Sequence, residues 1–362
     1  MSKDVKRRLS DLKARRQGSF IAMDSLVESS VSMESFEARS TGEWAKYTLG
    51  IMQEVDPKYT ATSIAEGERV KNQIKSRIST SVSFEYQGSV PLNVHIRGAS
   101  DIDILVLLSG YLTYDTSGVG ASGYLPWTGP SGIDQLAYLR GELEDGLEAA
   151  FPEADVDTAG DKAIGLSGGS LKRKVDVVPS YWNDSATYQA SKSKKDREVC
   201  IFQKRSRTTF TNRPFLHIDK VSEKDRRCNG GAKKIIRMLK NLKADCDNPS
   251  SIAVNSYEIA GLVYHFEDGP ISLPVYRELA LVAEARQQLD RMINHKQWTM
   301  GLTTPDGIRK IIDSEAKFDS LRLLRAEVNE LAKNLAIELT RDLWVNDNDA
   351  IRALTESYVS ER

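Results

Sequence analysis

The sequence predicts an α+β fold in two lobes, one built on a small mixed sheet and the other made of helices. Two short apolar runs, within 101–108 and 171–178, have the length and the Val, Ile and Leu content of buried strands. From about residue 214 onward, apolar residues recur at helical spacing instead. A sheet-bearing segment that interrupts helices accounts for this order.

The chain before the first apolar run is predicted to be helical and then extended. Segments 37–55 and 62–80 carry apolar residues at helical spacing, with Ser or Thr near each start. The sequence "SVSFEY" (81–86) alternates apolar and polar residues and is β-branched or aromatic at its apolar positions, which is typical of a strand. We therefore expect two helices, a strand, and then the strand at 101–108.

Beyond residue 108, loops alternate with regular elements. Segment 109–132 is rich in Gly, Ser and Thr and is predicted to be a long loop, with a helix at 133–150. Two further strands are expected near 161–167 and 171–178, on either side of the turn "GLSGG". A basic cluster at 192–207 comes before the helical region. It is predicted either as a solvated loop or as a rim that steers anions.

Composition excludes several classes of protein. Lys and Arg total 50 against 51 for Asp and Glu, so no global field draws the chain to nucleic acid or to an anionic membrane. Its three cysteines (Cys200, Cys228 and Cys246) are far apart, which supports neither a disulfide framework nor a zinc ribbon. No apolar run approaches the roughly 20 residues of a membrane span. We expect a cytoplasmic protein with no membrane association.

Three carboxylates in strand-like surroundings require a counter-charge. Asp101 and Asp103 begin the run "DIDILVLL" and project from the same side of a strand, because side chains alternate between its faces. Asp176 lies in the Val-rich run "KVDVVPSYW". Carboxylates that meet at one point suit Mg²⁺ or Mn²⁺, and two such ions about 3.5–4 Å apart assist displacement at phosphorus. The alternative is that Asp101 caps a turn while the other two pair with Lys or Arg.

A possible phosphate-binding turn precedes these carboxylates. Gly88 and Ser89 end the "SFEY" strand, and Val90 and Pro91 follow. Ser before Pro is a helix-start signal, so the turn is expected to present backbone N–H groups and a hydroxyl to phosphate oxygens. Gly88 permits a close approach of backbone and ligand. Gly-Ser followed twelve residues later by Asp-Ile-Asp, with a third Asp in a later strand, is a specific combination.

This combination resembles a known family. "GSVPLNVHIRGASDIDILVLL" together with "KVDVVPSYW" resembles the DNA polymerase β-like nucleotidyltransferases. Within them it is most similar to the bacterial cGAS/DncV-like enzymes, the second-messenger synthases of anti-phage CBASS operons. "KKIIRMLKNLK" and "NSYEIAGLVYHF" resemble the helix pair that contacts the donor nucleotide in that family. The resemblance implies a catalytic core in 1–212, a helical lobe in 213–362, and an active site in the cleft between the lobes.

The resemblance also assigns roles to the acidic and phosphate-binding residues. It implies that Asp101 and Asp103 bind two metal ions, Mg²⁺ with Mn²⁺ as a substitute. Asp176 would bind the ion that activates the acceptor hydroxyl and act as, or beside, the general base. Gly88 and Ser89 would hold the triphosphate.

In the helical lobe, the implied nucleotide contacts have structural alternatives. Lys240 and Ser256 match the residues that hold the triphosphate, and Tyr257 matches one that stacks on a nucleobase. Arg237, one turn before Lys240, is a further candidate. Without the motif, Lys240 would be a solvated helix face, Ser256 a helix-start residue and Tyr257 a core residue.

The functional hypotheses differ in their substrate. A second-messenger synthase condenses NTPs, ATP or GTP among them, into a cyclic di- or trinucleotide that a downstream effector senses. An RNA-tailing enzyme of the poly(A) or CCA-adding type shares the core but favours a basic RNA-binding surface, which a net charge of −1 does not indicate. A catalytically inactive binding module is the third hypothesis, and retention of all three Asp argues against it. The chain lacks a Cys/His zinc insertion, so no DNA sensing is expected. Base choice and linkage remain open.

Overall fold

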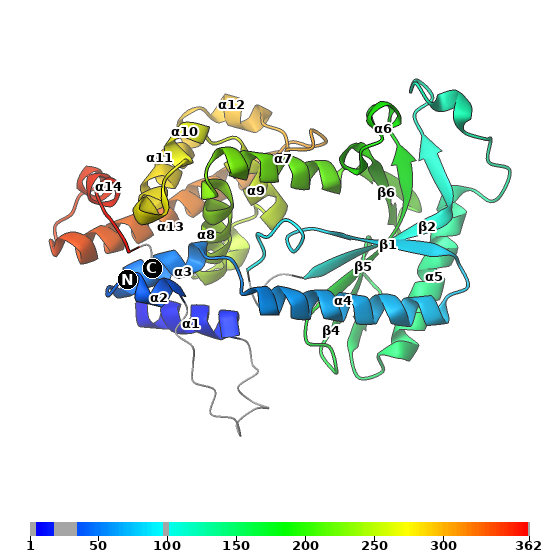
Figure 1. Ribbon diagram of the computed structural model, residues 1–362, viewed down its shortest axis with the longest axis horizontal. Coiled ribbons are helices and arrows are strands. Elements are labelled where there is room, and N and C mark those ends of the chain that lie inside the picture. The colour runs from blue at the N-terminus through cyan, green and yellow to red at the C-terminus, as the bar shows by residue number, and fades with distance from the viewer. Residues whose placement is uncertain (1–4, 18–34, 97–100, 361–362) are drawn as a thin grey trace. The chain divides into compact units, whose positions relative to one another are not determined.

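The computed structural model describes residues 5–17, 35–96 and 101–360. The chain divides into two compact units (Figure 1). The sheet unit comprises Asp56–Leu92 and Ser100–Asp219, and the helical unit comprises Met1–Val55, Asn93–Ala99 and Lys220–Arg362. The predicted mixed sheet and helical region are both present.

The sheet unit contains seven strands. They are β1 (Val82–Gln87), β2 (Ile102–Tyr114), β3 (Asp155–Asp157), β4 (Ile164–Ser167), β5 (Val175–Asp184), β6 (Glu198–Gln203) and β7 (Thr208–Asn212). The order is β1-β2-β5-β4-β3, and β6 joins β5 to β7. β2 and β5 run parallel, whereas the other pairs are antiparallel. The sheet is therefore mixed, as predicted.

Two long helices cover one face of this sheet (Figure 1). α4 (Pro57–Arg77) and α5 (Gly132–Ala150) pack against alternate residues of β2 and β5 in one apolar cluster. Ile104 and Val177 belong to that cluster, while their neighbours Leu105 and Val178 belong to a smaller cluster on the opposite face. Because strand side chains alternate, Asp103 and Asp176 lie on the face opposite α4 and α5.

The remaining helices of the sheet unit are short. They are η2 (Ala121–Gly123), α6 (Ala186–Ser191), η3 (Lys194–Asp196) and the start of α7 (Pro214–Arg227). Ser185 caps α6 by accepting a hydrogen bond from the backbone N–H of Tyr188.

Three sequence predictions for the sheet unit were wrong. The loop expected from residue 109 begins only after Tyr114, because β2 resumes pairing with β5 at Leu112 after a shift in register. β3, β6 and β7 were not predicted, since β3 has only three residues and basic residues flank β6 and β7. The helix expected to start at Pro91 does not form: residues 88–93 are turns, with φ of +80° at Gly88 and +58° at Asn93.

The helical unit is formed from both ends of the chain. Its helices are α1 (Val5–Gln17), α2 (Ser35–Ala38), α3 (Glu43–Met52), α8 (Gly231–Asp245), η4 (Pro249–Ser251), α9 (Ser256–Tyr264), α10 (Asp268–Ile271), η5 (Val275–Arg277), α11 (Ala280–Asn294), α12 (Lys296–Gly301), α13 (Glu315–Thr340) and α14 (Asp347–Thr355). α8 packs against α3, α9, α11 and α13. The N-terminal helices thus belong to the same compact unit as the C-terminal helices. The predicted functional boundary at 212/213 stays a prediction.

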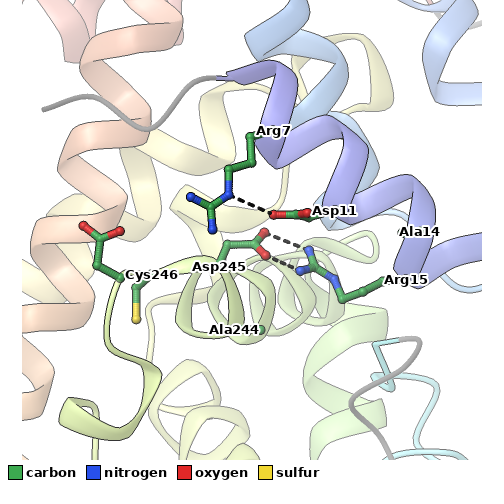
Figure 2. Close-up of a pocket in the computed structure, with 8 residues that line it drawn as sticks. Arg7, Asp11, Ala14, Arg15, Ala244, Asp245 and Cys246 are labelled. Atoms are coloured by element: carbon green, nitrogen blue, oxygen red, sulfur yellow. Dashed lines mark hydrogen bonds and ion pairs between the residues drawn. The ribbon is translucent and has the colours of Figure 1, made fainter.

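Ionic contacts fasten α1 to the end of α8. Figure 2 shows Arg7, Asp11 and Arg15 of α1 beside Asp245, around a cavity of about 410 Å³. Both guanidinium NH groups of Arg15 donate to Asp245, which also accepts the hydroxyl of Tyr47 at 2.7 Å. Most of the charged side chains that line this cavity pair with one another. We therefore interpret the cavity as part of the packing contact between α1 and α8 and not as a ligand site.

Among the residues that the structure describes, no helix has both the length and the apolar character needed to cross a membrane.

Candidate active site

Asp103 and Asp176 lie directly opposite each other on neighbouring parallel strands. Their Cα atoms are partners in the β2–β5 ladder. Adjacent strands are about 4.8 Å apart, and partners in a ladder project from the same face. The two carboxylates predicted from separate motifs are therefore neighbours on the face of the sheet that α4 and α5 leave uncovered.

The turn after β1 packs closely on this pair. Gln87 is the ladder partner of Asp103, so Gly88 follows directly beside it. A Cβ atom at position 88 would overlap Oδ2 of Asp103, and the φ of +80° at Gly88 belongs to the left-handed region. Ser89 is the next residue of the same turn and is half-buried. Glycine at 88 thus suits the backbone conformation and leaves room for the Asp103 carboxylate.

Lys174 contacts both Asp101 and Asp176. The sequence analysis did not identify this residue. Its ammonium lies 2.9 Å from Oδ2 of Asp101 and 3.6 Å from Oδ1 of Asp176. The backbone brings the two segments together, because the N–H of Ile102 donates to the carbonyl of Lys174 at 3.1 Å. Lys174 precedes Asp176 by two residues in an extended segment, which is the spacing that places two side chains on one side.

Burial and charge shift the pKa values of this group. The pKa of Asp176 is raised above its ordinary value, chiefly by burial; the negative charge of Asp101 acts in the same direction, and Lys174 opposes it. The pKa of Lys174 is also raised, mainly by its hydrogen bond to Asp101. In the absence of a cation, Asp176 therefore takes up a proton at a higher pH than an ordinary Asp.

The donor set fits a hard divalent cation. The three side chains offer only carboxylate oxygens, which Mg²⁺ and Mn²⁺ prefer. Within residues 5–17, 35–96 and 101–360, no three His, Cys, Asp or Glu side chains are already gathered as a metal-binding group. Asp101 and Asp176 are instead paired with the ammonium of Lys174. The ion pair that the alternative expected is thus present for Asp176, whereas Asp101, which it expected to cap a turn, is also paired with Lys174. The metal role stays a prediction.

The helical unit holds Lys240 in a buried position. Its ammonium donates to the carbonyl of Val94 at 2.7 Å, and the residue is only 4% exposed. On the same helix, Arg237 donates to the carbonyls of Met52 and Asn93, each at 2.7 Å. Burial lowers the pKa of Arg237 to about 10. Lys240 is therefore not a solvated helix face, and its triphosphate contact stays a prediction.

Ser256 and Tyr257 begin α9 behind a capping box. Asn255 caps the helix and Glu258 closes the box by accepting the N–H of Asn255 at 2.8 Å, which leaves Ser256 exposed at the first helical position. The hydroxyl of Tyr257 donates to Asp306 at 2.8 Å. Burial, followed by the charge of Asp306, raises the pKa of Tyr257.

Arg309 is a second residue that the sequence analysis missed. Its guanidinium lies 4.8 Å from the centroid of the Tyr257 ring, where a cation–π contact forms. No local motif predicts this pair, because Arg309 follows a turn 52 residues away from Tyr257 in the sequence. The stacking role of Tyr257 remains a prediction.

The basic cluster at 192–207 is largely paired with carboxylates of the sheet unit. The pairs are Lys194 with Glu85, Lys195 with Asp219, Arg197 with Asp184, Lys204 with Glu144, and Arg207 with Asp134. These contacts favour a structural role over the alternative of a steering rim.

Comparison with known proteins decides the family. Residues 219–335 match the model of the cGAS/DncV-like nucleotidyltransferase C-terminal helical domain. A cyclic dinucleotide synthase, CdnE of Yersinia aleksiciae, is 40% identical over 325 residues, which cover 88% of this chain and 85% of the relative. The chain belongs to the cGAS/DncV-like nucleotidyltransferases.

Two further comparisons agree with this membership. A c-di-GMP synthase of Capnocytophaga granulosa is 30% identical over 313 residues, covering 80% of this chain and 87% of the relative. The solved structure of a STING-associated CdnE c-di-GMP synthase from Capnocytophaga granulosa has a TM-score of 0.71 and 27% identity, covering 92% of this chain and 99% of that one. The predicted family, fold class and nucleotidyltransferase activity are confirmed, and cyclic oligonucleotide synthesis is supported over RNA tailing. The family uses divalent metal ions.

Proposed function

We propose that this nucleotidyltransferase condenses two NTPs into a cyclic dinucleotide and releases pyrophosphate at each bond-forming step. The observation that carries the proposal is the direct opposition of Asp103 and Asp176, with Gly88 packed against Asp103. Relatives with names of cyclic dinucleotide synthases support a product of two nucleotides over one of three.

Asp101, Asp103 and Asp176 are the residues that would hold two divalent cations, Mg²⁺ with Mn²⁺ as a substitute. The cations would supply charge neutralisation at the transferred phosphoryl group and lower the pKa of the attacking hydroxyl. The oxygen-only donors and their shared face of the sheet support this assignment.

The chain itself supplies proton transfer and positioning. A ribose hydroxyl of the acceptor attacks the α-phosphorus of the donor, the bond to the β-phosphate oxygen breaks, and pyrophosphate leaves. Asp176 accepts the proton of that hydroxyl, or acts beside the group that does, from its position opposite Asp103. Ser89 presents its hydroxyl from the turn that begins at Gly88 and donates to the donor triphosphate. The linear intermediate then turns, so that its own triphosphate serves as the donor for ring closure.

In the helical unit, Lys240 and Ser256 are the proposed contacts to the donor triphosphate and Tyr257 the proposed base platform. The exposure of Ser256 at the start of α9 supports its part. To contact the triphosphate, the Lys240 ammonium has to give up its hydrogen bond to the carbonyl of Val94. Alternatively, Lys240 acts indirectly, by holding the backbone at Val94 in place. The substrates are proposed to be ATP, GTP or both, and a downstream effector is proposed to sense the product.

Incubation of the full chain with Mg²⁺ or Mn²⁺ and labelled NTPs tests the proposal. Products are digested with phosphatase and identified by mass spectrometry, with each NTP alone and in pairs. We expect a phosphatase-resistant species of two nucleotides without any primer. If the enzyme is silent with NTPs but extends an added RNA oligonucleotide, the tailing function replaces the synthase.

A further inference from the structure

Lys174 occupies a distinctive place among the charged groups of the sheet unit. It is the residue immediately before β5, and its ammonium contacts Asp101 at 2.9 Å and Asp176 at 3.6 Å. These are two of the three carboxylates in the proposed metal site. Asp101 and Asp176 come from segments that run side by side, so the ammonium of a single lysine side chain reaches both carboxylates.

The contacts are of the kind that a bound cation could replace. The side chain of Lys174 is 48% exposed, and those of Asp101 and Asp176 are 37% and 24% exposed. An ammonium on a flexible four-carbon stem exchanges partners readily at such a site, because water can solvate it when it leaves. A salt bridge with this exposure is weak, whereas a divalent cation carries twice the charge.

Without a cation, the three carboxylates would repel each other. Asp103 lies directly opposite Asp176, and Asp101 precedes Asp103 by two residues. Like charges at such spacing destabilise a fold. Lys174 offsets this repulsion, since its positive charge is the one that directly contacts both Asp101 and Asp176 in the ion pairs of the described chain.

We propose that Lys174 is a resident counter-ion of the catalytic carboxylates, which a divalent cation must displace from Asp101 and Asp176 before it binds. This inference rests on the proposed function, because it takes the three carboxylates as the metal ligands. Lys174 is a positioning residue in this account: it keeps the metal-free carboxylates together and sets the concentration of metal needed to load them.

Metal binding without nucleotide is the direct test. The full chain is stripped with a chelator and titrated with Mn²⁺, and free Mn²⁺ is followed by its electron paramagnetic resonance signal. Lys174→Met should bind Mn²⁺ roughly three- to tenfold more tightly than the native chain, because a weak ammonium–carboxylate competitor is gone. Lys174→Arg, which retains the cation, should stay close to the native affinity.

Two controls separate the inference from the proposed function. Lys172→Met removes an exposed lysine from the same segment, and we expect an unchanged Mn²⁺ affinity from it. Asp103→Asn tests the site itself and should abolish binding. Metal-free Lys174→Met should also melt at a lower temperature than Lys172→Met, and Mn²⁺ should remove that difference.

The outcomes are distinguishable. Unchanged or weaker Mn²⁺ binding by Lys174→Met, with binding still lost in Asp103→Asn, overturns the counter-ion role and leaves the metal site standing. Equal tightening in Lys172→Met and Lys174→Met also overturns it, since a general charge effect would then suffice. Native binding by Asp103→Asn overturns the proposed metal site and the inference together.

Discussion

The backbone of Gly88 lies against the Asp103 carboxylate so closely that a Cβ atom at position 88 would overlap Oδ2. The turn that bears Ser89 thus packs against the strand that bears Asp103, and the close contact is between Gly88 and Oδ2 of Asp103. A side chain added at position 88 would therefore displace the Asp103 carboxylate.

Gly88→Ala should therefore impair catalysis more than it impairs folding. The added methyl group meets the end of a side chain, so Asp103 must rotate away from its position, while the φ of +80° adds about 1 kcal/mol or more of backbone strain. Product formation should fall by about 100-fold or more, because a misplacement on the order of 1 Å at a reacting group has that cost. The measurement is the rate of pyrophosphate release beside the melting temperature.

Gly168→Ala is the matched control for backbone strain. Gly168 has a φ of +71° in the same unit, but a Cβ atom there would meet nothing within 4 Å. It should lose similar stability and retain activity. Equal losses of activity in both variants would show that strain, and not the displacement of Asp103, explains the effect.

Lys240→Met should weaken both stability and the use of donor NTP. Its buried ammonium donates to the carbonyl of Val94, and removal of that bond leaves a buried carbonyl unpaired, at about 1–3 kcal/mol. Loss of a triphosphate contact should raise the KM for NTP by about tenfold or more as well.

Lys243→Met removes a bond of the same kind, since Lys243 donates to the carbonyl of Val254 at 2.6 Å. It lies outside the predicted triphosphate contacts, so we expect a lower melting temperature and an unchanged KM. The same rise in KM in both variants would make Lys240 a structural residue only.

Tyr47→Phe should destabilise the helical unit without a change in KM. The hydroxyl of Tyr47 donates to Asp245, which is held by Arg15 from α1, and Tyr47 is fully buried. Loss of this bond should cost about 1–2 kcal/mol, visible in chemical unfolding. Tyr264→Phe serves as the control, because no hydrogen bond from its hydroxyl is present in the described part of the chain. Identical unfolding curves for Tyr47→Phe and the native chain would contradict the role of this contact.

Sequence reasoning located the carboxylates because their chemistry conflicts with their surroundings. Asp103 and Asp176 interrupt Val- and Leu-rich runs, which predicts strands and a charge partner at once. The extension of β2 to Tyr114 could not be predicted, because it depends on a shift of register against β5. Local composition is ambiguous there: Tyr111, Thr113 and Tyr114 suit a strand, but Gly110 and the Gly- and Ser-rich segment that follows favour a loop.

Long-range partners were the other limit. The contact between Lys174 and Asp101 forms only because β2 and β5 are adjacent, since the two residues are 73 positions apart in the sequence. Lys240 illustrates the same point: the helical pattern of α8 indicates an amphipathic helix but not the carbonyl of Val94, 146 residues earlier. Segment 88–93 was predicted to start a helix, because Ser and Pro are common both at helix starts and in turns. The positive φ angles at Gly88 and Asn93 are those of a turn and not of a helix.

Cyclic product formation by Asp103→Asn, compared with Asp157→Asn, tests the central claim most directly. Asp157 is an exposed carboxylate in the same ladder row, separated from Asp176 by Gly165. With NTPs and Mg²⁺ and no primer, the native chain and Asp157→Asn should yield a phosphatase-resistant dinucleotide, whereas Asp103→Asn should yield none and keep the native melting temperature or exceed it. Near-native synthesis by Asp103→Asn would contradict the account.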